Sequence, residues 1–215
     1  MHKTTYIIEC LSCVMRNMEL GNIMEKKYKQ EELREMEKTI SDFFEKEKLT
    51  LFRTDYVDPI LIARELGFSV YSIPLENRID GLIGVDDKPL LGTRSNKIII
   101  INENAKTSQF KRFIVAHELA HYIENKGSKS FACRDSFSEI RSDNEQRMDY
   151  YAASILMPIN SVINDIKIIE NSEKEKGETK ESLDCTIIDL LAKKYDVSPV
   201  VAERRLHEAR IYNGD

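Results

Sequence analysis

The sequence predicts an α+β protein in which about three antiparallel strands pack on one buried helix. Short apolar runs joined by turns lie at 68–75, 79–85 and 97–102, with a further extended piece at 88–92. Runs this short and this close in sequence assemble most simply as an antiparallel sheet. The segment SQFKRFIVAHELAHYIEN at 108–125 is apolar on nearly every side, a pattern typical of a helix inside a protein.

The composition is that of a globular chain and excludes several classes of protein. Of 215 residues, 41% are hydrophobic and 32% are charged, and the net charge is only −5, so the strongly basic surface that binds nucleic acid or anionic membranes is not expected. No apolar run approaches the ~18 residues of a membrane-spanning helix, and the first stretch lacks a secretory cleavage site. The four cysteines are too few and too irregularly spaced for a disulfide framework. We therefore expect a soluble cytoplasmic protein.

Helical patterns lie on both sides of the predicted sheet. From 25 to 48, apolar residues recur at a spacing of three and four, and opposite charges fall three or four apart. This pattern predicts an amphipathic helix that packs one stripe on the body of the protein. Pro59 opens a short helix that Gly67 ends. After a polar loop at 128–137, a second long helix is expected at 138–157 and a shorter one at 159–169.

Charge and composition divide the chain into four parts. We expect an N-terminal extension with the charged helix at 1–54, a globular domain at 55–170, a charged linker without apolar residues at 171–182 and a C-terminal helical segment at 183–215. The last part contains two helices broken at 197–199 and looks like a helix-turn-helix unit. Its basic and acidic side chains cancel, which favours packing or partner recruitment over DNA binding.

His117, Glu118 and His121 form an H-E-x-x-H motif in the predicted buried helix. Positions four apart lie on one face of a helix, so the two imidazoles can converge on one ion. Glu118 lies about 100° around the helix from His117, close enough to touch a metal-bound water without being a ligand. Zinc favours imidazole nitrogen and requires a third protein ligand, leaving one position for water. The motif therefore predicts a catalytic zinc site.

A third ligand is expected on the next long helix. Glu145 and Asp149 are four apart and face one way, so Glu145 can coordinate the metal while Asp149 accepts the outer N–H of a ligating histidine. Small residues follow at Ala152 and Ala153, which would let this helix approach the buried one. Position on the helix favours Glu145, and three other carboxylates remain candidates: Glu139, Asp143 and Asp135.

Together these motifs resemble the thermolysin-type zinc peptidases, the gluzincins, and more closely the ImmA/IrrE family of small bacterial and phage metallopeptidases. The matching strings are VDPILIARELGFSV, KIIIIN, FKRFIVAHELAHYI and EQRMDYYAASILMP, which fall within 55–165, with a weaker match over LAKKYDVSPVVAERRL. The resemblance implies a small zincin-like catalytic domain. It implies His117, His121 and Glu145 as metal ligands and Glu118 as the catalytic base. The ligand types favour zinc, with manganese as the alternative.

One position departs from the family pattern. Family members often have Asn where Asp149 stands, whereas Asp is the thermolysin-like choice, so the place of Asp149 behind a ligating histidine is inferred from the motif alone. No donor that would stabilise the oxyanion is identified. Tyr150 and Tyr151 lie off the Glu145/Asp149 face and are interpreted as packing residues, and His207 is interpreted as a surface or core residue.

The resemblance implies a zinc-dependent endopeptidase that uses metal-activated water, with Glu118 as general base, to cleave a protein substrate. By family analogy, the substrate would be a helix-turn-helix repressor of a mobile element or stress regulon, whose cleavage lifts repression. The alternative is a metal-stabilised binding module that sequesters such a repressor without cutting it. Neither reading expects direct contact with nucleic acid or membrane.

Overall fold

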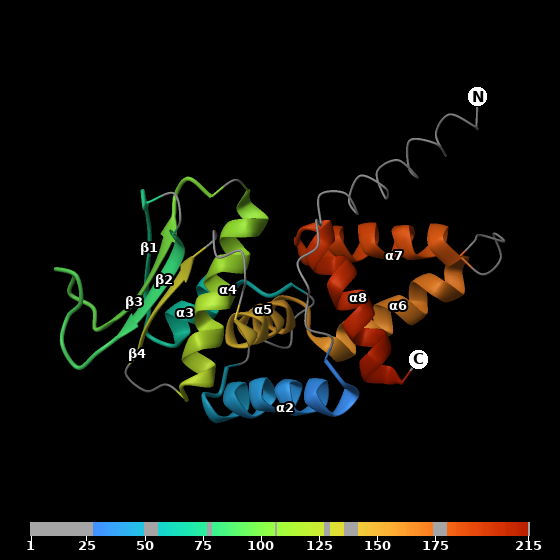
Figure 1. Cartoon of the computed structure of the whole chain (residues 1–215), viewed down its shortest axis with the longest axis horizontal. Coiled ribbons are helices and arrows are strands. Elements are labelled where there is room, and N and C mark those ends of the chain that lie inside the picture. Colours follow the sequence, from blue (N-terminus) through green and yellow to red (C-terminus); the bar gives the residue numbers. More distant parts are fainter. Residues whose placement is uncertain are drawn as a thin grey trace.

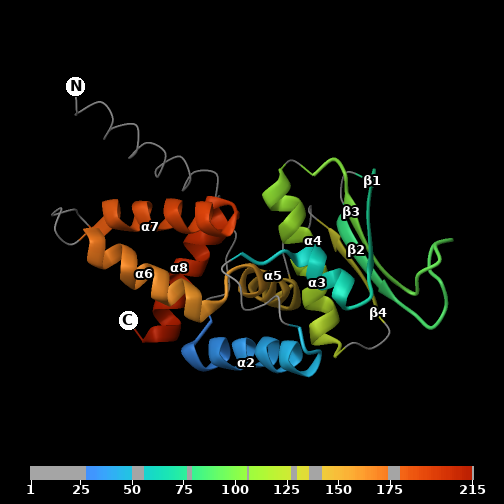
Figure 2. The same cartoon turned by 180° about the vertical axis from the view of Figure 1, so that it is seen from behind.

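The computed structural model describes residues 28–49, 56–76, 79–105, 107–126, 130–135, 142–173 and 180–214. In chain order its elements are α2 (Gln30–Lys46), α3 (Pro59–Glu65), β1 (Ser69–Ile73), β2 (Ile79–Val85), β3 (Lys97–Asn102), α4 (Ser108–Glu124), β4 (Ser130–Asp135), α5 (Asp143–Leu156), α6 (Ile159–Glu173), α7 (Lys180–Tyr195) and α8 (Pro199–Asn213). The α+β class is as predicted. The sheet and the helices α6 to α8 lie at opposite ends of the molecule, with α4, α5 and α2 between them (Figures 1 and 2).

The sheet differs from the predicted antiparallel one in strand number and in direction. In the described part of the chain it has four strands in the order β1-β3-β2-β4. β2 is antiparallel to both β3 and β4, but β1 is parallel to β3, with Val70 opposite Ile99. β3 lies between β1 and β2, the two strands that precede it in the sequence. It runs parallel to β1 and antiparallel to β2. The prediction had assumed that strands adjacent in sequence pair with each other.

Two local predictions about the strands were also wrong. β4 lies where a polar loop was expected at 128–137. It pairs with β2 along one side, and an edge strand with polar residues at both ends carries a weak apolar signal. The predicted extended piece at 88–92 is instead a turn within the connection from β2 to β3, where Leu91 adopts a φ of 49°.

Side-chain caps explain where the helices begin. Asp58 Oδ1 accepts a hydrogen bond from the Ile60 N–H at 2.9 Å, and Thr107 Oγ1 accepts one from Phe110 at 3.1 Å. Ser142 caps α5 in the same way, so this helix begins at 143 and not at the predicted 138. These caps satisfy backbone N–H groups that have no partner within the helix.

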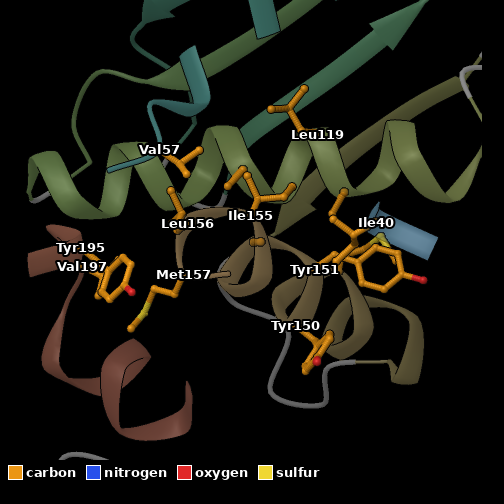
Figure 3. Packing of buried hydrophobic residues seen from close by; sticks show 14 of the residues in the cluster. Ile40, Val57, Leu119, Tyr150, Tyr151, Ile155, Leu156, Met157, Tyr195 and Val197 are labelled. Atoms are coloured by element: carbon orange, nitrogen blue, oxygen red, sulfur yellow. The ribbon is translucent and has the colours of Figure 1, made fainter. Parts of the chain in front are cut away.

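α4 is the central helix of the fold. From Ile114 to Ile123 every residue is buried, because α4 packs against β2 and β3 on one side and against α5 on another. Figure 3 shows Leu119 of α4 pointing away from Ile155 and Leu156 of α5. On α5 the small residues Ala152 and Ala153 are buried, which is consistent with the predicted close approach of the two helices.

α2 packs one apolar stripe on the body, as its spacing predicted. The buried members of the stripe are Leu33, Met36, Ile40, Phe43 and Phe44, and α2 contacts α5 and α8. The C-terminal helices join the same hydrophobic core through residues such as Tyr195 and Leu206. α6 and α7 extend into the predicted linker at 171–182 from either side. In the described ranges no single helix is both long and apolar enough to cross a membrane; α5 and α6 pass that test only as a pair bent by 64°.

Arg112 of α4 is a buried connector between distant segments. Its Nη2 donates to the Val57 carbonyl before α3 at 2.7 Å. Its Nη1 donates to the carbonyl of Tyr195, the last residue of α7, at 3.1 Å, and to the carbonyl of Asp196, which follows it. A guanidinium supplies several donors in one plane, so this one side chain ties α4 to both neighbours.

We expect Arg112→Ala to lower the free energy of unfolding by about 2–4 kcal/mol, because it leaves several buried carbonyl groups without their donor. Urea denaturation followed by circular dichroism measures the change. Lys111→Ala, one position earlier on α4, is the matched control and should stay near the wild type. Equal midpoints for the two variants would contradict the connector role.

Candidate metal centre

Two imidazoles face each other on α4. His117 and His121 are one helical turn apart, and their ring centroids are 5.1 Å apart. Both rings are buried. Burial of two titratable rings side by side costs free energy unless each finds a polar partner, and both find one on α5.

Glu145 of α5 lies across from both rings. Its Oε2 is 3.1 Å from His117 Nε2, and its Oε1 is 3.4 Å from His121 Nε2. One ligand atom from each of the three residues lies within 4.8 Å of the others, so the group could hold a metal ion. With Zn–ligand bonds of ~2.0–2.1 Å and tetrahedral angles, ligand atoms stand about 3.3 Å apart. The two separations between imidazole nitrogen and Glu145 oxygen, 3.1 and 3.4 Å, lie close to that value.

Asp149 lies behind His117. Its Oδ1 is 2.8 Å from His117 Nδ1, and its carboxylate is buried. A carboxylate can only accept here, so Nδ1 carries the proton and donates to Asp149, which leaves Nε2 with its lone pair. That lone pair and the Glu145 oxygen then face each other as two acceptors, an arrangement that a cation between them stabilises. The donor chemistry therefore fits a divalent metal ion.

Glu145 is ionised near neutral pH, as a metal ligand has to be. Burial acts to raise its pKa, but the hydrogen bond with His117 and the positive charge that either imidazole carries when it is protonated outweigh burial and hold the pKa below its ordinary value. About a third of the Glu145 side chain is exposed, whereas that of His117 is almost fully enclosed. The centre is therefore open to solvent on the Glu145 side.

Glu118 is fully buried and lies against strand β2. An added Cβ at Gly81 would stand 3.1 Å from Glu118 Oε1 and 2.4 Å from Ile114 Cγ2. Gly81 thus permits the close approach of α4 to β2 that brings the carboxylate beside the strand. Sequence reasoning missed this residue. The sequence does carry a sign of it, because Gly81 lies inside the apolar run IDGLIGV. A glycine within a strand often marks a place where another segment approaches the backbone closely.

The structure thus brings together four of the five predicted site residues, His117, His121, Glu145 and Asp149, and places Glu118 beside β2. Among the rival ligands, Asp143 is exposed at the start of α5. Glu139 and the side chain of Asp135 lie outside what the structure describes.

The remaining side chains that sequence analysis weighed lie away from these contacts. Tyr150 and Tyr151 are buried in the core, in agreement with their interpretation as packing residues. Burial raises the pKa of Tyr151 to about 12 and raises that of Tyr150 further, so neither phenol ionises near neutral pH. His207 is exposed on α8.

Comparison with models of protein families gives a match over more than half of the chain. The model of a family described as Peptidase_M78, the IrrE N-terminal-like domain, matches residues 63–207. The match runs from α3 to α8 and includes the whole metal centre and Gly81. A search of curated proteins found no similar sequence.

We expect Glu145→Ala to weaken zinc binding at least about a hundredfold, because it removes the carboxylate that faces both imidazoles. Competition with a chromophoric chelator measures the affinity. Asp143→Ala, at the exposed rival two positions away, is the control and should leave the affinity unchanged. If Asp143→Ala is the variant that loses zinc, the ligand assignment is wrong.

We expect Gly81→Ala to destabilise the protein by about 1–3 kcal/mol, because the new methyl group overlaps Ile114 and crowds Glu118. Thermal or urea denaturation measures the loss. A double-mutant cycle with Ile114→Ala tests the cause, since removal of the overlapped methyl group should make the two costs non-additive. Strict additivity would show that the close approach is not the source of the loss.

Proposed function

The chain belongs to the Peptidase_M78 family of IrrE N-terminal-like metallopeptidases, and from that premise we propose that it is a zinc-dependent endopeptidase with Glu118 as its general base. A peptidase of this family is a hydrolase whose substrate is a protein or peptide. Three points go beyond family membership and are proposed here. They are the identity of the ion, the role of each residue and the kind of protein that is cut.

One observation carries the proposal: Glu145 reaches both imidazoles of the H-E-x-x-H motif from a separate helix. Its two carboxylate oxygens lie 3.1 and 3.4 Å from the Nε2 atoms of His117 and His121. Two imidazoles and one carboxylate form one of the known protein ligand sets of catalytic zinc sites, in which the fourth position stays open. The partly exposed Glu145 supports an opening toward solvent.

The donor set also favours zinc over its competitors. Imidazole nitrogen suits zinc, whereas manganese prefers sites richer in oxygen and binds more weakly to a given ligand set. When bound, a divalent ion would supply Lewis-acid activation of water and of the peptide carbonyl group.

Glu118 is proposed to move the protons. A carboxylate next in sequence to a ligating histidine can take a proton from the attacking water and pass it to the leaving amine. Its position against Gly81 restricts where the carboxylate can turn, because β2 backbone closes one side. Asp149 would hold the ring of His117 in one tautomer and orientation through the 2.8 Å contact at Nδ1.

We propose a helix-turn-helix repressor as the protein substrate, on the strength of the family resemblance. The few, irregularly spaced cysteines support a cytoplasmic location for the enzyme. The near-neutral charge of the C-terminal helices supports a contact with protein over one with nucleic acid. The direct experiment incubates the zinc-loaded protein with the repressor encoded beside its gene and identifies fragments by mass spectrometry.

We expect Glu118→Gln to abolish cleavage, with a loss of several orders of magnitude in rate, while zinc content stays at the wild-type level. Glu103→Gln, at an exposed glutamate after β3, should cut normally. The Glu118→Gln variant also separates cleavage from sequestration, because a binding module that carries this substitution would neutralise the repressor as well as the wild type does. Fragments from Glu118→Gln at the wild-type rate would refute the assignment of the base.

A further inference from the structure

A second cluster of buried polar side chains lies outside the metal centre. We call it the Glu37 cluster, and it consists of Glu37 of α2, Tyr150 and Ser154 of α5, and Arg205 and Glu208 of α8. Arg205 is completely buried. Three helices that are distant in sequence therefore meet at charged groups inside the protein.

Glu37 is the shared acceptor of this cluster. Its Oε1 accepts from Arg205 Nη2 at 2.7 Å and from the Tyr150 hydroxyl at 2.7 Å, and it also accepts from Ser154 Oγ. Arg205 donates further to Ser154 Oγ at 2.8 Å and to the Met157 carbonyl at 2.8 Å. One carboxylate from α2 thus fastens α5 and α8 together.

The charges balance when α2 is in place. On α8, Arg204 and Arg205 both bond to Glu208, which leaves one positive charge, and Glu37 supplies the matching negative charge. Burial acts to lower the pKa of Arg205, but the carboxylate of Glu37 outweighs it and the pKa is raised. The guanidinium is therefore charged, and loss of Glu37 would leave part of that charge without compensation.

The Glu37 cluster holds the back of the helix that carries Glu145 and Asp149. Tyr150 lies about 100° around α5 from Asp149, and Ser154 lies about 140° around it. Tyr150 and Ser154 are four apart and so share one face. Figure 3 shows Tyr150 on the side of α5 away from α4. α5 therefore makes polar contacts with His117 on one face and with Glu37 on another.

α2 also lies outside the part of the chain that the family model matches. That match begins at residue 63, whereas α2 ends at Lys46. The cluster nevertheless joins Glu37 to three residues within the matched range. The helix before the family domain is thus bonded to the domain's own metal-binding helix.

We propose that Glu37 is a positioning residue of the metal centre: through Tyr150 and Ser154 it holds the rotation of α5 at which Glu145 and Asp149 meet the two histidines. This inference rests on the proposed role of the centre as a metal site. A small rotation of α5 is enough to displace Glu145. Side-chain atoms lie ~6 Å from a helix axis, so a rotation of α5 by about 10° about its own axis shifts the Glu145 side chain by ~1 Å. Shifts of that size are enough to spoil a metal site.

The test separates positioning from stability. Tyr150→Phe combined with Ser154→Ala removes both α5 donors to Glu37, while the aromatic ring and the ion pair between Glu37 and Arg205 remain. Glu37→Ala removes the acceptor itself. Glu35→Ala, at an exposed glutamate on the same helix, is the control. Zinc affinity and the visible spectrum of the cobalt-substituted protein are measured below the unfolding transition of each variant.

We expect the double variant to bind zinc roughly tenfold more weakly and to show a changed cobalt spectrum, as loss of outer support does at other metal sites. Glu37→Ala should do the same if it folds, and Glu35→Ala should match the wild type. A folded double variant with wild-type affinity and spectrum would overturn the proposal and reduce the cluster to a stabilising one. Neither readout needs a substrate, so the outcome is independent of whether the protein cleaves a repressor.

Discussion

The hydrogen bond between His117 and Asp149 is the interaction on which the metal centre depends. It crosses from α4 to α5 inside the core, so it fixes the relative position of the two helices and the direction of the His117 ring together. With Nδ1 committed to Asp149, Nε2 faces Glu145 and the second histidine. The packing that allows this bond comes from small residues on α5 and from the fully buried middle of α4 around its two histidines.

The rest of the fold serves to hold these two helices. The sheet covers α4 from one side, with Gly81 admitting the close approach at Glu118. Arg112 ties the start of α4 to the chain before α3 and to the junction of α7 with α8. α2 and α8 support α5 from behind through buried charged groups. The C-terminal helices also belong to the same hydrophobic core as α4, the helix that packs on the sheet.

Local patterns predicted most of what lies within single elements. The H-E-x-x-H spacing, the apolar stripe of α2, and the four-residue spacing of Glu145 and Asp149 all follow from helix geometry. What pattern reasoning missed depends on pairing between distant segments. The parallel pairing of β1 with β3 and the presence of β4 reflect which strands meet, and sequence proximity does not determine that. Arg205 and Glu37 are 168 positions apart, so neither residue carries a local sign of its partner.

The three residues of the centre differ in their contact with solvent, and this has a consequence for how an ion is exchanged. Both rings are enclosed by the core, while Glu145 is partly exposed and stands in the first turn of α5, where Ser142 caps its N–H. The first turn is the part of a helix that opens most easily. A chelator would therefore gain access by fraying of one helical turn, and we expect the residence time of a bound ion to follow that local opening and not global unfolding.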